Sequence, residues 1–249
     1  MSTEEPEAPY SRYRDWKGWR ADAFGALDVN TRRYFDSEFQ RCGLADLEGA
    51  SIVEIGFGNG EFAVWATGRG AEYHGTEQIA DLVRTGRERG FDVHEAPESL
   101  DVLAEAGSAD VVVAFDVFEH LGLDDLREMW ASIRRLLKPG GALVARVPSG
   151  DSPFARAIQH GDLTHQTVLS TSSIEQLADE SGFDVAQVRA PAFPLSGIGL
   201  RSMIRRFAVV LVRSIVYPIT THALMGGGKL VLTPDLIFVL RKPRAGESD

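Results

Sequence analysis

The sequence contains little cysteine and comparatively little basic charge. Among its 249 residues Cys42 is the single cysteine, which excludes an internal disulfide framework and a cysteine-based zinc site. Lys and Arg number 26 against 36 Asp and Glu, and the net charge of −10 argues against a general nucleic-acid-binding protein. Residues 1–9 lack the basic and apolar regions of a signal peptide. We therefore expect a cytoplasmic protein without a nucleic-acid partner.

The chain is long enough for one large α/β domain with a substantial core. A hydrophobic content of 44% and a charged content of 25% are typical of soluble globular proteins. Residues 1–9 are acidic and are predicted to be disordered. Residues 10–40 are rich in aromatic side chains and are predicted to be helical. We therefore expect a helical cap or lid over residues 1–46, followed by the main domain over residues 47–249.

Strand-like and helix-like segments then alternate along the main domain. Short apolar runs predict strands at residues 51–55, 71–75, 92–95, 110–115, 142–147, 183–189 and 235–241. Helical spacing predicts helices at residues 61–67, 79–89, 123–137 and 172–181. Such alternation predicts an α/β fold with a mostly parallel sheet and helices on both faces.

The most informative segment is residues 51–62, which read SIVEIGFGNGEF. A short apolar strand runs into Gly56, Gly58 and Gly60, and a helix-like segment follows at once. Strand, glycine turn and helix together bring a nucleoside cofactor against bare backbone and a helix N-terminus. The spacing G-x-G-x-G differs from the G-x-G-x-x-G of dinucleotide-binding proteins. The segment therefore predicts a nucleoside cofactor other than a dinucleotide.

Four motifs in order resemble the class I S-adenosylmethionine-dependent methyltransferase family. They are VEIGFGNGEF, HGTEQ with its acid Glu77, DVVVAFDVFEHL, and LLKPGGALVARVP. The match is clear over residues 47–147 and weaker beyond. The resemblance implies a Rossmann-like seven-stranded sheet whose last strand, residues 235–241, is antiparallel. It also implies S-adenosylmethionine as the cofactor and makes residues 47–249 a methyltransferase domain.

The resemblance also implies which residues bind the cofactor. It places the glycine turn against the methionine moiety, Glu77 on the ribose hydroxyls and His120 near the reacting sulfonium. The expected set is Glu54, Gly56, Phe57, Gly58, Gly60, Glu77, Gln78, Ile79, Glu95, Ala96, Asp116, Val117 and His120. The chain departs from the family at Ala96, where an acid near the adenine is usual, so Glu95 or Glu98 would have to replace it. Asp116 could equally be a helix-capping carboxylate, and His120 could be a packed histidine.

The methyl acceptor is expected to meet the loop that follows the strand at residues 142–147. His165 is the predicted general base because histidine has a suitable pKa, with Asp162 or His160 as its orienting partner. A plain surface loop is the alternative. His160, Asp162 and His165, aided by Asp116, could also hold a divalent metal, but a metal site is not predicted.

The segment DLTHQTVLSTSSIEQLADESGF resembles the subgroup that modifies sugars and surface polysaccharides. It favours an O-methyltransferase acting on a hydroxyl of a sugar or glycan precursor, so the partner is a small-molecule or oligosaccharide acceptor. One alternative is an O- or N-methyltransferase of aromatic or quinone-like natural products. Another is a non-catalytic binding protein that kept the cofactor fold. Aromatic residues near the N-terminus could form a lid over the acceptor or pack in the core: Tyr10, Tyr13, Trp16 and Trp19.

Residues 201–224 depart from the minimal family pattern and lie in an expected helical insertion at about residues 198–228. Their apolar stripe and arginines suit a helix lying on an anionic membrane. A membrane span is not expected, because Arg213 and Pro218 interrupt the segment. Apolar residues on more than one face favour burial over the acceptor pocket or across a homodimer interface instead. Membrane association is therefore the disfavoured alternative.

Overall fold

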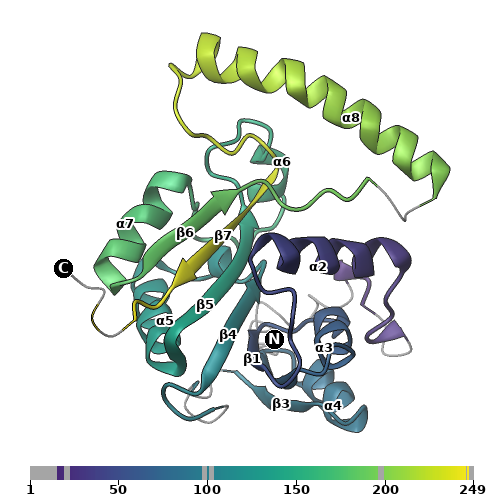
Figure 1. The fold of residues 1–249 in the computed structure, drawn as a ribbon, viewed down its shortest axis with the longest axis vertical. Coiled ribbons are helices and arrows are strands. Elements are labelled where there is room, and N and C mark those ends of the chain that lie inside the picture. The colour runs from purple at the N-terminus through teal and green to yellow at the C-terminus, as the bar shows by residue number, and fades with distance from the viewer. Residues whose placement is uncertain are drawn as a thin grey trace, which may run out of the picture.

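A computed structural model describes residues 16–19, 23–96, 100, 104–195, 199–244 and 246. Its centre is one seven-stranded sheet in the order β3-β2-β1-β4-β5-β7-β6 (Figure 1). The strands are β1 (Ser51–Ile55), β2 (Glu72–Glu77), β3 (Asp92–Glu95), β4 (Ala109–Phe115), β5 (Leu137–Pro148), β6 (Asp184–Arg189) and β7 (Asp235–Arg241). Strand β7 lies between β5 and β6 and runs antiparallel to both, whereas the other pairs of neighbouring strands are parallel. The predicted fold class and the antiparallel last strand are confirmed.

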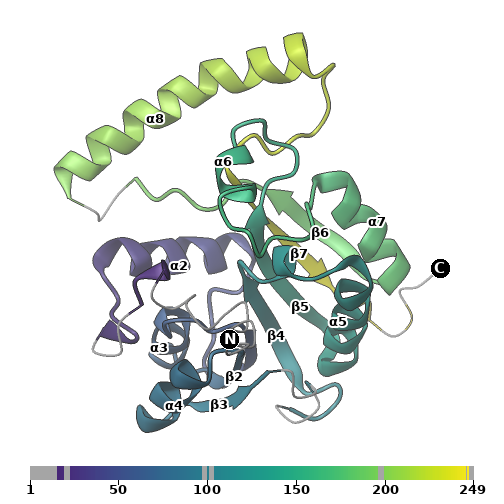
Figure 2. The ribbon, with the colours of Figure 1, turned by 180° about the vertical axis from the view of Figure 1, so that it is seen from behind.

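Helices cover both faces of the sheet (Figures 1 and 2). The labelled helices are α2 (Val29–Arg41), α3 (Glu61–Thr67), α4 (Ala80–Glu88), α5 (Leu123–Leu136), α6 (Arg156–Gln159), α7 (Thr171–Ser181) and α8 (Leu200–Ile219), of which α8 lies apart from the sheet. One buried core lies between the sheet and α5 and α7, and a second lies between the sheet and α2, α3 and α4. Ile52 packs in the second core and Val53 in the first, because successive strand side chains point to opposite faces.

The transition from α5 to β5 differs from the expected turn. The Lys-Pro-Gly-Gly segment at residues 138–141 was expected to end the helix and precede the strand, yet β5 already begins at Leu137. Leu137 pairs with Ala109 of β4, and Gly140 and Gly141 exchange backbone hydrogen bonds with Lys242 of the neighbouring chain segment. A register shift in the β4–β5 pairing absorbs the irregular segment.

The expected continuous helix over residues 10–40 is wrong within the described residues. Helix α2 begins only at Val29, where the Asp28 side chain accepts a hydrogen bond from the Thr31 N–H group (2.7 Å). Gly18 and Gly25 before it have φ angles of 69° and 70°, a left-handed conformation that breaks a helix. Tyr10 and Tyr13 lie outside the described residues.

Helix α8 and the π-helical turn η4 (Thr220–Leu224) lie apart from the sheet and its flanking helices (Figures 1 and 2). No residue of α8 is buried, so this chain alone does not bury the apolar residues of the helix, and burial across a homodimer interface stays a prediction. The helix runs through Arg213 and Pro218, the two residues that argue against a membrane span in the sequence. By length and composition alone, residues 200–224 could cross a membrane; no other helix among the described residues meets that criterion.

Candidate functional site

A cavity of about 1010 Å³ opens at the carboxyl ends of β1, β2 and β4, the edge at which open α/β sheets bind ligands. Most of the predicted cofactor residues line it: Glu54, Gly56, Phe57, Gly58, Glu77, Gln78, Ile79, Ala96, Asp116, Val117 and His120. Among the described residues, the lining does not include Gly60, Glu95, Asp162 or His165. The ends of these strands thus line one cavity that is large enough for a nucleoside and a second ligand.

The glycine turn is tied to the end of β2 through its backbone. The N–H groups of Gly56 and Phe57 both donate to the carbonyl oxygen of Thr76 (2.8 and 3.0 Å). The N–H group of Gly58 donates to Oε2 of Glu77 (2.9 Å). Gly56 has a φ of 71°, which only glycine adopts at little cost, and this conformation exposes bare backbone to the cavity.

Two aromatic side chains pack against the same turn. A Cβ on Gly58 would lie 3.2 Å from the Trp19 ring, and a Cβ on Gly60 would lie 2.3 Å from the Phe24 ring. Gly60 is therefore required by packing, although it was predicted as a cofactor contact. Trp19 lines the cavity, whereas Trp16 is 60% exposed. The N-terminal segment thus covers part of the cavity, as a lid would, through Trp19.

Glu77 is a buried carboxylate that three backbone groups hold in place. It accepts hydrogen bonds from the N–H groups of Gly58, Gln78 and Ile79 at 2.9, 2.7 and 3.1 Å. Burial raises the pKa of Glu77, and the three N–H groups partly oppose that shift. A carboxylate has about four lone-pair sites, so these bonds leave one for a ligand hydroxyl. The arrangement fits the predicted contact with a ribose.

Glu54 lies deeper in the cavity wall and is only 3% exposed. Its Oε2 accepts a hydrogen bond of 2.6 Å from the Tyr73 hydroxyl group. Burial raises the pKa of Glu54 to about 8, more than the Tyr73 bond lowers it. A neutral carboxyl at pH 7 in the ligand-free protein is therefore ready to ionise beside a cationic ligand.

The expected adenine contacts lie at the ends of β2 and β3. Gln78, Ile79 and Ala96 line the cavity, and the Ala96 N–H group donates to the Glu77 carbonyl oxygen (2.9 Å). Glu95 is exposed and outside the lining, and Glu98 lies outside the described residues. The structure therefore brings no acid from β3 into the described cavity wall.

Asp116, at the tip of β4, has a φ of 57° and is the one non-glycine residue with positive φ in the described part of the chain. Such a conformation costs about 1–2 kcal/mol. Arg146 of β5 donates from Nε to Oδ1 of Asp116 (2.9 Å) and from Nη2 to Oδ2, a bidentate pair. The following 3-10 turn has no side-chain cap, so Asp116 is held by Arg146 and does not cap that turn.

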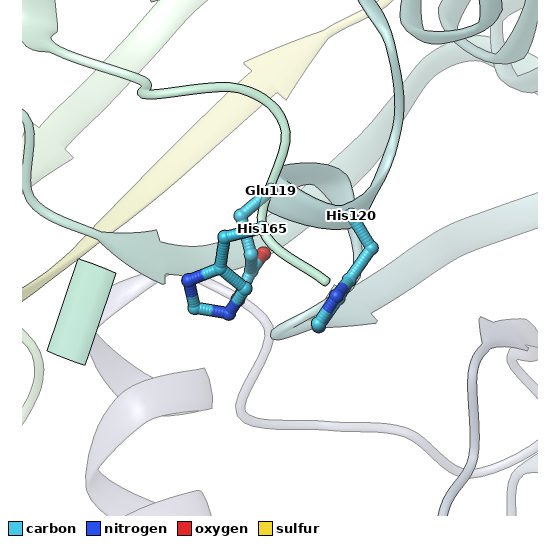
Figure 3. A group of neighbouring side chains, drawn as sticks. All are labelled: Glu119, His120 and His165. Atoms are coloured by element: carbon cyan, nitrogen blue, oxygen red, sulfur yellow. The ribbon is translucent and has the colours of Figure 1, made fainter. Parts of the chain in front are cut away.

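A second group of polar side chains borders the cavity where η3 (Phe118–His120) follows β4 (Figure 3). Glu119 and His120 come from this turn, and His165 comes from the loop before α7. The two imidazole rings lie 4.7 Å apart at an angle of 70°. Oε1 of Glu119 lies 4.0 Å from Nε2 of His165, and Glu119 is 2% exposed. Of the two histidines, His120 faces the cavity and His165 lies behind it.

Hydrogen bonds fix which ring nitrogens carry protons. Nδ1 of His165 lies 3.0 Å from the Gln159 carbonyl oxygen, which can only accept, so Nδ1 is the donor. The Thr164 hydroxyl group donates to Oδ1 of Asp162 (2.5 Å) and therefore accepts from Nδ1 of His120 (2.8 Å). In its neutral form each of the two rings thus carries its proton on Nδ1, and Nε2 is the unprotonated nitrogen.

Burial and hydrogen bonds together set the charges of Glu119, His120 and Asp162. Burial, and next the nearby His165, lower the pKa of His120, which keeps the ring neutral. Burial acts to raise the pKa of Asp162, but hydrogen bonds from Thr164 outweigh it and lower that pKa. Burial raises the pKa of Glu119 well above its usual range. The result is an ionised Asp162 linked through Thr164 to a neutral imidazole at the cavity wall.

The same group could hold a divalent cation. Glu119, His120 and His165 each offer one atom, and these atoms lie within 4.8 Å of one another. Nitrogen and oxygen ligands of this kind suit first-row divalent metals. Oε2 of Glu119 is buried without a hydrogen-bond partner. The set differs from the metal alternative considered from the sequence, because His160 is exposed at the end of α6 and Asp162 is engaged by Thr164.

Sequence reasoning missed three basic residues of the cavity wall, Lys17, Arg146 and Arg206. Arg146 could have been found, because it is the one charged residue inside the apolar run at residues 142–147. Arg206 could not, because it reaches the cavity from α8, far along the chain. Tyr34 lies beside Arg146, and burial raises the pKa of Tyr34 to about 12.

Comparison with known proteins gives the same assignment as the motifs. Residues 27–188 match a family model described as a methyltransferase domain. The ubiquinone biosynthesis O-methyltransferase of Cupriavidus pinatubonensis is 25% identical over 176 residues, which are 63% of this chain and 69% of that protein. The tuberculostearic acid methyltransferase of Mycobacterium tuberculosis is 26% identical over 153 residues, 60% of this chain but 32% of that protein.

A solved structure shares the fold. The S-adenosylmethionine-dependent methyltransferase from Archaeoglobus fulgidus superposes with a TM-score of 0.60 and 18% sequence identity. The match covers 85% of this chain and 94% of the archaeal chain. Identity at that level shows a common fold and leaves the acceptor open.

Proposed function

The chain belongs to the methyltransferase-domain family and is an S-adenosylmethionine-dependent methyltransferase, and from that premise we propose that it methylates a hydroxyl group with His120 as the general base. The observation that carries the proposal is the linkage of Asp162 through Thr164 to His120 in the cavity wall. The family match leaves the alternative of a non-catalytic binding protein without support. The assignment of His165 as base stays a prediction, and the same variants test it.

Several cavity residues suit the cofactor. The bare backbone of the Gly56–Gly58 turn and the carboxylate of Glu77 would hold its methionine and ribose parts. Glu54 would meet its ammonium group, because burial keeps that carboxyl ready to ionise. When bound, the cofactor supplies an activated methyl group on a sulfonium. The protein then has to align the acceptor and exclude water.

The proton of the acceptor has a defined destination. Nδ1 of His120 already donates to Thr164, so the acceptor proton passes to the lone pair on Nε2. The ionised Asp162, acting through the Thr164 hydroxyl group, stabilises the imidazolium that forms. His165 contacts the His120 ring and keeps it in position.

We take the acceptor to be a hydroxyl of a sugar or glycan precursor, which is supported by the D-x-T-H sequence at residues 162–165. Asp162 and Thr164 of this sequence belong to the linkage just described, and His165 contacts the His120 ring. A phenol of quinone type is the second candidate. Its support is the O-methyltransferase relative and the aromatic side chains in the cavity wall, Trp19, Tyr34 and Phe115.

Labelled methyl transfer to a panel of sugars, oligosaccharides and phenols tests the proposal. We expect turnover with a hydroxyl acceptor, and a fall of about 10²–10⁴-fold in kcat for His120→Ala with the affinity for S-adenosylhomocysteine retained. The matched control is His160→Ala, an exposed histidine of the neighbouring turn, which should keep full activity. The His165→Ala variant should reduce kcat less than His120→Ala.

The following outcomes would contradict the proposed base and the proposed acceptor. Unchanged kcat in His120→Ala would remove it as the base, and a larger loss in His165→Ala would transfer that role to His165. Transfer only to amine acceptors would exclude the O-methyl assignment. Repeating the assay with a chelator, and then with added Mg²⁺ or Mn²⁺, tests whether Glu119, His120 and His165 bind a cation.

A further inference from the structure

Helix α8 presents large apolar side chains to solvent. Leu200, Ile204, Phe207, Leu211 and Ile215 are each between 56% and 68% exposed. Their spacing of three or four residues places them on one face of the helix. A surface helix of a soluble protein normally turns such a stripe toward the core. The outward face of α8, defined by these five residues, is therefore an apolar surface that the described chain leaves uncovered.

The opposite face of α8 contacts the rest of the protein with polar groups. Nη1 of Arg206 donates to the Pro194 carbonyl oxygen (2.7 Å), and the Arg206 and Arg213 guanidinium groups lie 5.0 and 5.2 Å from the Phe193 ring centre. Arg206, Arg213 and Tyr217 are partly buried along this face. Arg206 and Arg213 thus face the protein, whereas the five large apolar side chains face outward.

The charge of this region also differs from that of the chain. Residues 185–234 contain six Lys and Arg and not one Asp or Glu, although the whole chain has a net charge of −10. Arg201 and Arg205 are exposed on α8 beside the outward face. Basic residues bordering an apolar helix face are complementary to an anionic lipid surface, which offers phosphates to the arginines and hydrocarbon to the aliphatic groups.

We propose that α8 lies in the plane of an anionic bilayer surface, with the outward face in the acyl region and Arg201 and Arg205 on the lipid phosphates. Although residues 200–224 are long enough to span a membrane, Arg213 would then lie inside the hydrocarbon, where a charge is costly. The contacts of Arg206 and Arg213 with the protein hold the helix along the surface. The proposal stands whether or not the acceptor assigned above is correct.

Vesicle flotation of the full chain is the direct test. We expect the protein to float with vesicles of phosphatidylcholine containing about one third phosphatidylglycerol, and to remain unbound with phosphatidylcholine alone. Raising the salt concentration from about 0.05 M to about 0.5 M should weaken binding because it screens the arginines. Absence of binding to the anionic vesicles would overturn the proposal.

Matched variants separate this surface from the rest of the molecule. Leu211→Glu, at the centre of the outward face, should abolish flotation, whereas Leu123→Glu, on a residue 47% exposed at the start of α5, should not. Arg201→Gln combined with Arg205→Gln should weaken binding about 10- to 30-fold. Retained binding of S-adenosylhomocysteine shows that each variant is folded. Flotation unchanged in both α8 variants would overturn the proposal.

A fluorescent label reports the depth of the helix. Cys42 is only 3% exposed, so a cysteine introduced at the surface can be labelled selectively. A polarity-sensitive dye on Phe207→Cys should shift to the blue when anionic vesicles are added, and the same dye on Ser172→Cys of α7 should not. No shift at residue 207 despite flotation would overturn the insertion of the outward face.

The alternative to a lipid surface is that a second copy of this chain covers the outward face. In that case sedimentation velocity would show a dimer of the unmodified protein that Leu211→Glu converts to a monomer, with no flotation of either. That result would overturn the membrane proposal. A monomer that floats only with anionic vesicles supports it.

Discussion

Glu54 is an acid placed where its ionised form is unfavourable. It is buried beside Tyr73 and near Glu77, and burial raises its pKa to about 8 from an ordinary value of 4.5. Between these two values the folded protein binds a proton that the unfolded chain releases. The contribution of Glu54 to stability is therefore fully present below about pH 4.5 and is lost as the pH rises through about 8.

Replacing Glu54 with Gln should remove this pH dependence. Between pH 6 and 8 we expect the free energy of unfolding of the unmodified protein to fall by up to about 1.4 kcal/mol per pH unit from this group, and Glu54→Gln to flatten the slope. Urea unfolding at several pH values measures it. The control is Glu88→Gln at the exposed end of α4, which should keep the slope. Equal slopes for all three proteins would show that Glu54 ionises normally.

For single residues, the sequence predicted which side chains belong to the site better than it predicted which other side chains they contact. The glycine turn and Glu77 were identified because their spacing is local to one strand–turn–helix unit. The pair of Asp116 with Arg146, 30 positions apart, was not foreseen, because only the pairing of β4 with β5 brings the two strand ends together. The contact of His165 with His120 likewise depends on the fold, although both residues were named from the sequence.

Helix α3 shows how one element depends on another. Its N-cap is Gly60 with a φ of 73°, and a Cβ there would meet the ring of Phe24 at 2.3 Å. The N-terminal segment therefore reaches the start of α3 only if that position lacks a side chain. This packing requirement, together with the left-handed conformation, accounts for the third glycine of the motif.

Gly60→Ala should consequently destabilise the protein more than the same substitution at a glycine that has a similar φ angle but no neighbouring atoms where the Cβ would lie. Gly49 has a φ of 67°, and a Cβ added there would meet nothing within 4 Å, so Gly49→Ala should cost only the conformational penalty of about 1–2 kcal/mol. Gly60→Ala should cost about 1–3 kcal/mol more because Phe24 has to move. Urea unfolding of the two variants compares them. Equal losses would mean that Phe24 adjusts freely.

Elements with a strong local pattern were predicted closely, and those that depend on neighbours were not. Strands β3 and β7 have the predicted bounds, and α5 differs by one residue, since their apolar periodicity is set by the sequence itself. Residues 138–141 were expected as a turn but are extended, because β4 and the segment after β7 provide hydrogen-bond partners for them. The N-terminal helix was overextended, because the left-handed Gly18 and Gly25 were not recognised as breaks.

For the molecule as a whole, the sheet with its two cores and α8 are separable parts. No residue of α8 is buried, so the cores do not depend on it. Arg206 nevertheless lines the cavity, so α8 borders it. A membrane-bound α8 would bring the cavity close to lipid, where an acceptor carried by a lipid could reach it.

Replacing residues 200–224 with a flexible Gly/Ser linker tests this separation. A linker of about 15 residues can cross the ~30 Å length of the helix. We expect the thermal midpoint Tm to change by less than about 4 °C and S-adenosylhomocysteine binding to persist, because the deleted helix buries little. Differential scanning fluorimetry and calorimetry measure both. A fall of more than about 10 °C would show that α8 is part of the folded core.

The sequence by itself determined the order of strands and helices, the glycine turn with Glu77, and through these the methyl-donor family. These features are local, since periodicity and turn chemistry act over a few neighbouring residues. Only the tertiary structure decided that Glu119, His120 and His165 meet, that Arg146 holds Asp116, and that α8 turns its apolar face outward. The sequence shows which face of a helix is apolar, but whether other residues cover that face depends on how the rest of the chain packs.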